Sequence, residues 1–152
     1  MKILDVLQKE AIITDLKSMN KPGVLNELVA PAARLSNTSP EEMVRVLMER
    51  EGLGSTGIGD GIGIPHGKLN GIDQTILGFG ISKKGVDFES IDGKPTYLFF
   101  LLITPENATD IHLKLLARIS RLLKKDPFKE LLVNASTRDE VISIIKNEDE
   151  EF

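Results

Sequence analysis

The sequence predicts one α/β domain over residues 1–152, with a mixed central β-sheet flanked by helices. Three observations support this fold class. The chain has 152 residues, which fits one domain, and no segment has the composition of an interdomain linker. Residues 97–103 form a short, continuous apolar run between two prolines, as expected of a buried strand. Helical patterns lie on both sides of that run, as in layered α/β folds. The strand order stays open at this stage.

The first half of the chain predicts two helices. Residues 21–35 carry apolar side chains at helical spacing, with Ser18 as the expected N-cap. Pro31 is expected to end or kink this helix, because proline lacks the N–H that a helix interior needs. The second helix has a stronger start signal: Ser39 as N-cap, a proline at the first helical position and a glutamate placed for a capping box. It should end near Gly52.

The second half predicts strands followed by helices. In chain order, the expected elements are a strand-like run at 75–82, the buried strand at 97–103, a long amphipathic helix at 109–125, a short helix at 127–133 and a last helix at 138–146. The segment Ser136–Asp139 should cap the last helix. The acidic run Glu148–Glu151 is expected to be a solvated terminus.

Composition excludes several function classes. There is no cysteine, so a disulfide framework, a thiol nucleophile and cysteine-based metal sites are excluded, and a reducing cytoplasm is compatible with this. The net charge of −4 argues against a general nucleic-acid binder. No apolar run approaches the ~20 residues that span a bilayer, and charges at Asp5 and Glu10 interrupt any signal-peptide pattern. We therefore expect a cytoplasmic protein that meets a membrane only indirectly.

More than half of the 13 glycines lie between Gly52 and Gly67, so the backbone there must turn tightly or approach another group closely. The segment that ends at Gly67 does not have the spacing of a nucleotide loop. In a Walker A motif Gly67-Lys68 would be followed by serine or threonine, but Leu69 stands there. Started from Gly57, Gly59 or Gly61, the dinucleotide fingerprint GxGxxG also fails, since Ile62, Ile64 and His66 stand where its last glycine would be.

The glycine-rich segment ends in Ile64-Pro65-His66-Gly67. Apolar residues alternate up to the histidine, which predicts a strand that places His66 at a surface edge. Imidazole suits phosphoryl transfer, because its pKa of ~6.5 leaves a neutral, nucleophilic nitrogen at cytoplasmic pH. A histidine merely packed in a turn is the alternative interpretation of these residues alone.

A family resemblance strengthens the functional interpretation. The stretch from Glu51 to Gly67 resembles the phosphorylation-site signature of the fructose/mannitol-type enzyme IIA of the bacterial phosphotransferase system. That signature runs from an acidic or amide residue to apolar-Ala-apolar-Pro-His-Gly, and the chain departs from it where Gly63 replaces the usual alanine. The resemblance covers nearly the whole chain in length and element order, and it implies that His66 is the phosphorylated residue.

The resemblance also assigns roles to His112 and Arg50. From the residues alone, His112 lies on the core-facing side of the expected helix at 109–125, which favours a core histidine whose ring bonds to the backbone. Arg50 is then expected to form a surface ion pair. The family implies that both hold phosphoryl oxygens. Ser55 and Thr56 are weaker candidates as phosphoryl or partner donors, with local capping as the alternative.

Two further site questions are open. Lys68 could steer an acidic partner or the phosphoryl group, or be a solvated loop lysine. Neither His66 nor His112 has a second ligand at helical spacing, so we expect neither a metal site nor a cofactor.

The resemblance implies a relay. Phospho-HPr would donate to His66 without direct use of ATP, and an enzyme IIB or a regulated protein would receive the phosphoryl group. The nitrogen-regulatory branch is slightly favoured by Ile64–Leu69, the fructose-transport component being the first alternative. A non-catalytic binding protein on the same fold is the alternative from another class. In each case the membrane is reached only through a permease, and no nucleic acid is involved.

Overall fold

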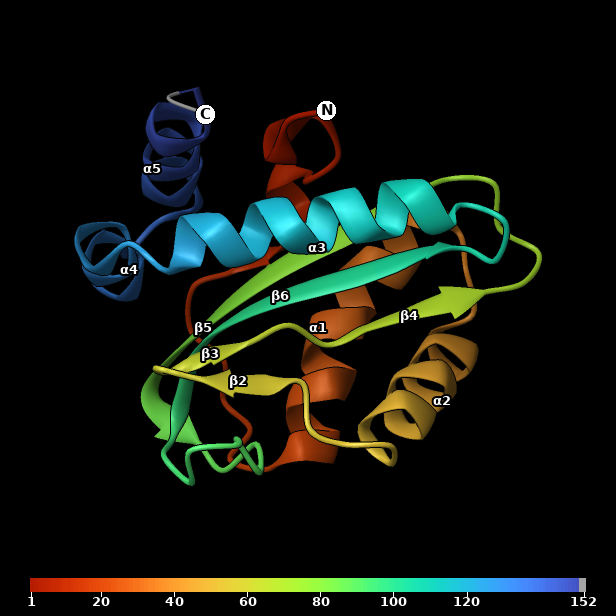
Figure 1. Cartoon of the computed structure of the whole chain (residues 1–152), viewed down its shortest axis with the longest axis horizontal. Coiled ribbons are helices and arrows are strands. Elements are labelled where there is room, and N and C mark those ends of the chain that lie inside the picture. Colours follow the sequence, from red (N-terminus) through yellow and green to blue (C-terminus); the bar gives the residue numbers. More distant parts are fainter. Residues whose placement is uncertain (151–152) are drawn as a thin grey trace.

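A mixed sheet lies between two layers of helices in the computed structural model, which describes residues 1–150 (Figure 1). The strands are β1 (Ile12–Ile13), β2 (Gly57–Gly59), β3 (Ile62–Gly63), β4 (His66–Leu69), β5 (Ile76–Val86) and β6 (Thr96–Pro105). The α-helices are α1 (Lys21–Ser36), α2 (Pro40–Glu51), α3 (Thr109–Leu123), α4 (Asp126–Val133) and α5 (Arg138–Glu150), and two short 3-10 helices, η1 (Ile3–Asp5) and η2 (Lys9–Ala11), precede β1. The predicted fold class is confirmed.

The strand order is β1-β5-β6-β3-β2, with β4 also paired to β6. The central pair, β5 and β6, is antiparallel. Both β3 and β4 run parallel to β6 along its other edge, with Ile62 opposite Leu98 and His66 opposite Leu102. Pro65 stands in the gap between β3 and β4, where its carbonyl still accepts the N–H of Leu102. These two short strands therefore form one interrupted strand beside β6, and His66 is the first residue of its second part.

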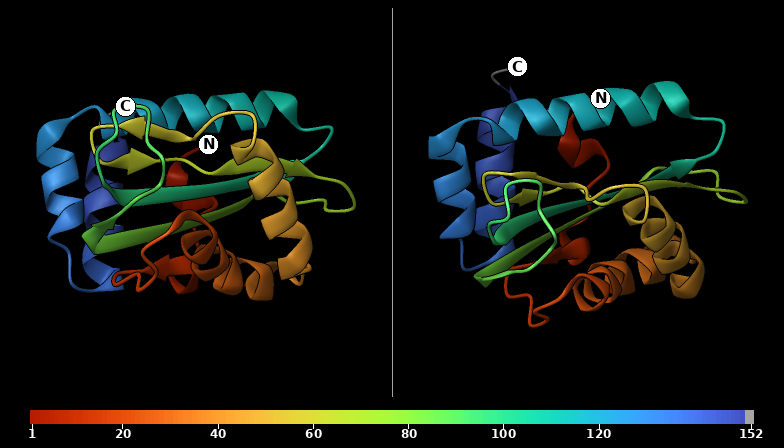
Figure 2. Two further views of the ribbon diagram at one scale, coloured as in Figure 1. Left: turned by 90° about the horizontal axis from the view of Figure 1, so that it is seen from below. Right: turned by 60° about the horizontal axis from the view of Figure 1, so that its bottom comes forward.

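Both faces of the sheet are buried, which explains the continuous apolar run in β6. Leu98, Phe100 and Leu102 belong to one hydrophobic core, together with residues of α3, α4 and α5. The intervening Phe99 and Leu101 belong to a second core with α1 and α2. Side chains alternate along a strand, so the single run supplies both cores. Figure 2 shows the sheet between α3 on one face and α1 and α2 on the other.

The first helix begins and ends differently from the prediction. Asn20, and not Ser18, is its N-cap, with Oδ1 accepting the N–H of Gly23 at 2.9 Å. Pro31 does not end the helix, which continues to Ser36 and stops where Asn37 adopts a left-handed conformation. Pro31 removes one helical hydrogen bond, but it is buried in the helix. Packing of this face therefore outweighs the lost bond.

The predicted start of α2 is confirmed, because Ser39 Oγ accepts the N–H of Glu42 at 3.3 Å. The carboxylate of Glu42 binds Arg45 at 2.8 Å and does not complete a capping box. The helix ends at Glu51, with Gly52 as C-cap, as predicted.

The C-terminal helix is longer than predicted, and the acidic run is not simply solvated. Helix α5 continues to Glu150, and the side chain of Asp149 is only 2% exposed. One oxygen of Asp149 lies 2.5 Å from Arg118 Nε and the other accepts the backbone N–H of Ile3 at 2.7 Å. The last residue of the acidic run, Glu151, lies outside the described residues. No helix within residues 1–150 is long and apolar enough to cross a membrane.

Candidate active site

The register of β4 on β6 decides which of its side chains meet α3. His66 lies opposite Leu102, and Lys68 opposite Thr104. Since Leu102 belongs to the core under α3, His66 and Lys68 lie on the same face as that helix. Gly67 faces the opposite layer, where an added Cβ would lie 2.6 Å from Val46 Cγ1 of α2. Strand β4 is therefore held closely between α2 and α3.

The hydrogen bond of the His66 ring determines its tautomer. Its Nδ1 lies 2.7 Å from the carbonyl oxygen of Ile64. A carbonyl can only accept, so Nδ1 carries the proton and the lone pair of the neutral ring lies on Nε2. Burial lowers the pKa of His66, the bond to Ile64 opposes that shift, and the positive charge of Arg50 adds to it. The ring is therefore neutral near pH 7, with a nucleophilic Nε2.

His112 faces His66 from α3. The two ring centroids are 5.5 Å apart and the ring planes are inclined by 59°. The Nδ1 atom of His112 lies 2.7 Å from the hydroxyl oxygen of Thr104 on β6. Burial, followed by the charges of His66 and Lys68, lowers the pKa of His112 to about 4. His112 is thus a buried, neutral hydrogen-bonding group beside His66.

Arg50, Lys68 and both histidines line one pocket at the edge of the sheet; Val46, Glu49, Leu53 and Gly67 complete it. The Nη1 atom of Arg50 donates to the carbonyl of Gly54 at 2.8 Å, which holds the guanidinium at the end of α2. Lys68 Nζ donates to Thr109 Oγ1 at 2.8 Å, at the start of α3. Glu49 is paired with Arg45 at 2.7 Å. The pocket therefore joins two cations to two neutral imidazoles, an arrangement that suits a transferable anion.

The remaining two candidates, Ser55 and Thr56, do not line this pocket. Ser55 Oγ donates to the carbonyl of Phe88 at 2.9 Å, and the hydroxyl of Thr56 donates to Glu51. The Thr56 hydroxyl therefore has the local role that is the alternative for this residue, whereas the Ser55 hydroxyl binds a residue far away in the sequence.

Sequence reasoning did not single out Thr104 or Lys21. Thr104 lies at the end of an apolar strand, and only its register opposite Lys68 puts it beside His112. Lys21 is buried although it is the first residue of α1. No local sequence signal marks either residue, because both roles arise from tertiary contacts.

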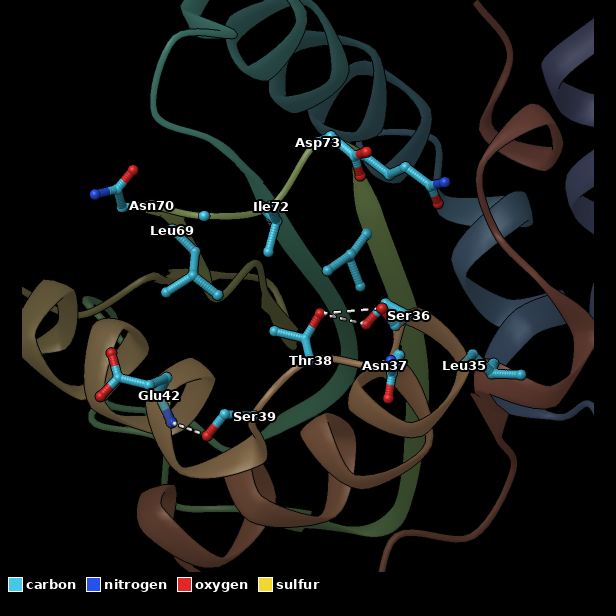
Figure 3. Close-up of a pocket in the computed structure, with 13 residues that line it drawn as sticks. Leu35, Ser36, Asn37, Thr38, Ser39, Glu42, Leu69, Asn70, Ile72 and Asp73 are labelled. Carbon is cyan, nitrogen blue, oxygen red and sulfur yellow. Dashed lines mark hydrogen bonds between the residues drawn. The ribbon is translucent and has the colours of Figure 1, made fainter.

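A second hollow lies between the α1–α2 turn and the β4–β5 connection (Figure 3). Its hydroxyl groups bond within the turn: Ser36 Oγ donates to Thr38 Oγ1 at 3.0 Å, and Ser39 caps α2. None of the predicted site residues lines it. Among residues 1–150, histidine and acidic side chains form no group of three that could hold a metal ion.

Fold and site together define an α/β domain with a histidine pair and two cations at one sheet edge. Residues 5–148 match the family model described as phosphoenolpyruvate-dependent sugar phosphotransferase system, EIIA 2. The chain belongs to this family.

Named relatives come from two branches. A nitrogen regulatory protein of Bradyrhizobium diazoefficiens is 40% identical over 95% of this chain and 95% of its own length. The crystal structure of nitrogen regulatory protein IIA-Ntr from Neisseria meningitidis has a TM-score of 0.87 and 34% identity, and the match covers 93% of this chain and 97% of that one. The fructose-specific EIIABC component of Bacillus subtilis is 36% identical over 98% of this chain, but the chain spans only 24% of that protein.

Proposed function

We propose that this protein is a cytoplasmic phosphocarrier that accepts a phosphoryl group on Nε2 of His66. The observation that carries the proposal is the bond between His66 Nδ1 and the Ile64 carbonyl. It leaves Nε2 as the nucleophilic atom, in a pocket that also contains Arg50, Lys68 and His112. The phosphoryl donor would be the phosphohistidine of HPr, as in the phosphotransferase system to which the family belongs. This step uses no ATP directly.

The transfer can be written from the geometry. The lone pair of Nε2 attacks phosphorus as the P–N bond to the donor histidine breaks, and that electron pair returns to the donor ring. The His66 ring then bears phosphorus on Nε2 and hydrogen on Nδ1, so it becomes cationic. The Ile64 carbonyl, already 2.7 Å from Nδ1, stabilises this charge without moving.

Arg50 and His112 would hold the phosphoryl oxygens. The planar guanidinium of Arg50 can bind two oxygens at once. A hydroxyl can donate as well as accept, so Thr104 can donate to Nδ1 of His112 and leave a proton on its Nε2. His112 would then donate to the phosphoryl group while remaining neutral. Lys68 would add positive charge at the mouth of the pocket.

Partner docking is supported by exposed aliphatic side chains near the histidines. Leu53, in the pocket itself, is 86% exposed, and Leu113, next to His112, is 59% exposed. Apolar groups around a polar centre are typical of contacts that form and dissociate.

The acceptor is an enzyme IIB or a regulated protein. A solved complex of enzyme IIA mannitol with phosphorylated enzyme IIB mannitol from Escherichia coli shares this fold, with a TM-score of 0.78 at 19% identity. We favour the nitrogen-regulatory role, because nitrogen regulatory proteins match this chain over 95% of their length at 40% identity in one case and 96% at 35% in another. The fructose-transport role is the second candidate, favoured by the 36% identity to the Bacillus subtilis component.

Intact-mass spectrometry tests the phosphocarrier proposal. The protein is incubated with phosphoenolpyruvate, enzyme I and HPr, beside His66→Ala and His112→Ala. We expect one acid-labile phosphoryl group on the wild type, none on His66→Ala and slower labelling of His112→Ala. A wild type that stays unlabelled with a matched HPr would leave the non-catalytic binding protein as the better account.

A further inference from the structure

A buried ion pair lies behind the active site, outside the pocket of His66. Lys21 Nζ of α1 is 2.9 Å from Glu51 Oε1 of α2, and the two side chains are only 7% and 2% exposed. The same ammonium lies 4.9 Å from the centre of the Phe88 ring and 3.1 Å from Glu89, whose side chain is exposed. Removing charges from water costs free energy, so a buried pair is weak support for a purely stabilising role.

The carboxylate of Glu51 binds the loop that follows α2. Its Oε1 accepts the backbone N–H of Thr56 at 3.0 Å, and its Oε2 accepts the hydroxyl of Thr56. Both donors of one residue are thus fixed by one carboxylate, which Lys21 holds from the other side. Thr56 is only 3% exposed, so water cannot readily replace these bonds.

Thr56 connects directly to the segment that carries His66. Its carbonyl accepts the N–H of Ile64 at 3.0 Å. The carbonyl of Ile64 in turn accepts from Nδ1 of His66 at 2.7 Å. The orientation of the peptide groups around Ile64 therefore depends on where Thr56 is held.

We propose that Glu51, with Lys21 as its buried counter-ion, is a positioning residue that sets the tautomer and orientation of His66 through Thr56 and Ile64. This proposal deepens the phosphocarrier function and rests on it. Glu51 acts through its hydrogen bonds to Thr56 and does not touch the phosphoryl group. Its charge is matched by Lys21, and it also raises the pKa of His66, though less than the Ile64 carbonyl does.

Two double variants separate these roles without leaving an unpaired buried charge. Lys21→Met with Glu51→Gln is neutral but keeps an amide oxygen for the Thr56 N–H and an amide group for its hydroxyl. Lys21→Met with Glu51→Leu is equally neutral but lacks both bonds. The matched control is Lys9→Met with Asp139→Leu, which removes an exposed ion pair whose residues do not line the pocket of His66.

The first readout is the ¹⁵N NMR spectrum of His66 in the unphosphorylated protein, which reports the protonated ring nitrogen. We expect Nδ1–H alone in the wild type, the control and the Gln variant, and a mixture of tautomers in the Leu variant. The second readout is phosphotransfer from HPr. We expect kcat to fall about tenfold or more in the Leu variant, to stay within about threefold in the Gln variant, and KM for HPr to change little.

Thr56→Val provides an independent single substitution that removes only the hydroxyl bond. It should fold and give an intermediate loss of kcat. The positioning role is overturned if the Leu variant keeps Nδ1–H and wild-type kcat, or if the Gln variant loses as much as the Leu variant, since charge would then be responsible. Failure of the wild type to accept phosphate would contradict the phosphocarrier function alone, because the tautomer comparison needs no phosphorylation.

Discussion

His66 and His112 face each other with ring centroids 5.5 Å apart, yet each ring binds a different backbone or side-chain group through Nδ1. His66 binds the Ile64 carbonyl and His112 the Thr104 hydroxyl. The two Nε2 atoms are therefore the ones left for chemistry. The two partners differ in what they allow. The Ile64 carbonyl can only accept, so Nδ1 of His66 must carry the proton, whereas the Thr104 hydroxyl can donate, so Nδ1 of His112 can be the unprotonated nitrogen.

Thr104→Val should impair the assisting role of His112. Valine has nearly the same shape as threonine but cannot donate to Nδ1, so the Nε2–H form of His112 loses its support. We expect kcat for phosphorylation by HPr to fall about tenfold, which corresponds to about 1.4 kcal/mol. Stopped-flow or quenched-flow labelling measures this rate. Equal rates for the variant and the wild type would remove Thr104 from the mechanism.

Thr96→Val makes the same substitution on the same strand, and it serves as the control for Thr104→Val. It also tests a separate prediction about stability. Thr96 is fully buried, and its hydroxyl is the buried side-chain group without a hydrogen-bond partner among the described residues. Replacing that hydroxyl with a methyl group removes a buried polar atom that has lost its contact with water. We therefore expect the free energy of unfolding to rise by about 1 kcal/mol. Urea denaturation checks this. A loss of stability would mean that the hydroxyl has a partner such as bound water.

Acid should destabilise the protein partly through His112. Its pKa is about 4 in the folded protein, whereas an unfolded histidine titrates near 6.5. Between these values the unfolded chain binds more protons, so stability falls as pH drops from 6.5 towards 4, by at most about 3 kcal/mol for this residue. Urea denaturation at pH 7 and pH 4.5 should show a smaller loss for His112→Asn. The same loss in both proteins would contradict a buried, neutral His112.

Gly67→Ala should disturb the site through α2. The added Cβ would lie 2.6 Å from Val46 Cγ1, so Val46 and the helix that carries Arg50 must move. We expect a loss of stability of about 1–3 kcal/mol together with slower phosphotransfer. Val46→Ala in the same chain should restore most of both, because it clears the space. A double-mutant cycle without coupling would show that the two residues do not contact each other.

Much of the fold follows from patterns in the sequence. The start of α2 at Ser39 and the strand at 97–103 depend on local signals, a cap and an uninterrupted apolar run, so both were predictable. The end of α1 was not, because Pro31 is outweighed by packing that appears only in the folded protein. The burial of Asp149 was likewise not predictable, since its partners Ile3 and Arg118 lie far away in sequence.

The site divides in the same way. His66 is marked by its local motif, and the pocket brings Arg50, His112 and Lys68 to it, which the sequence alone could suggest only through a family resemblance. The groups that orient the rings are a backbone carbonyl and a strand threonine. Neither has a chemical signature in sequence, because each gains its role from register and chain direction.

The most direct measurement of the central claim is the attachment point of phosphorus. The ¹⁵N-labelled protein is phosphorylated with phosphoenolpyruvate, enzyme I and HPr, and ¹⁵N–³¹P coupling is recorded by NMR. Our account predicts coupling to Nε2 of His66, with Nδ1 still protonated. Coupling to Nδ1 of His66, or phosphorus on any other residue, would contradict it.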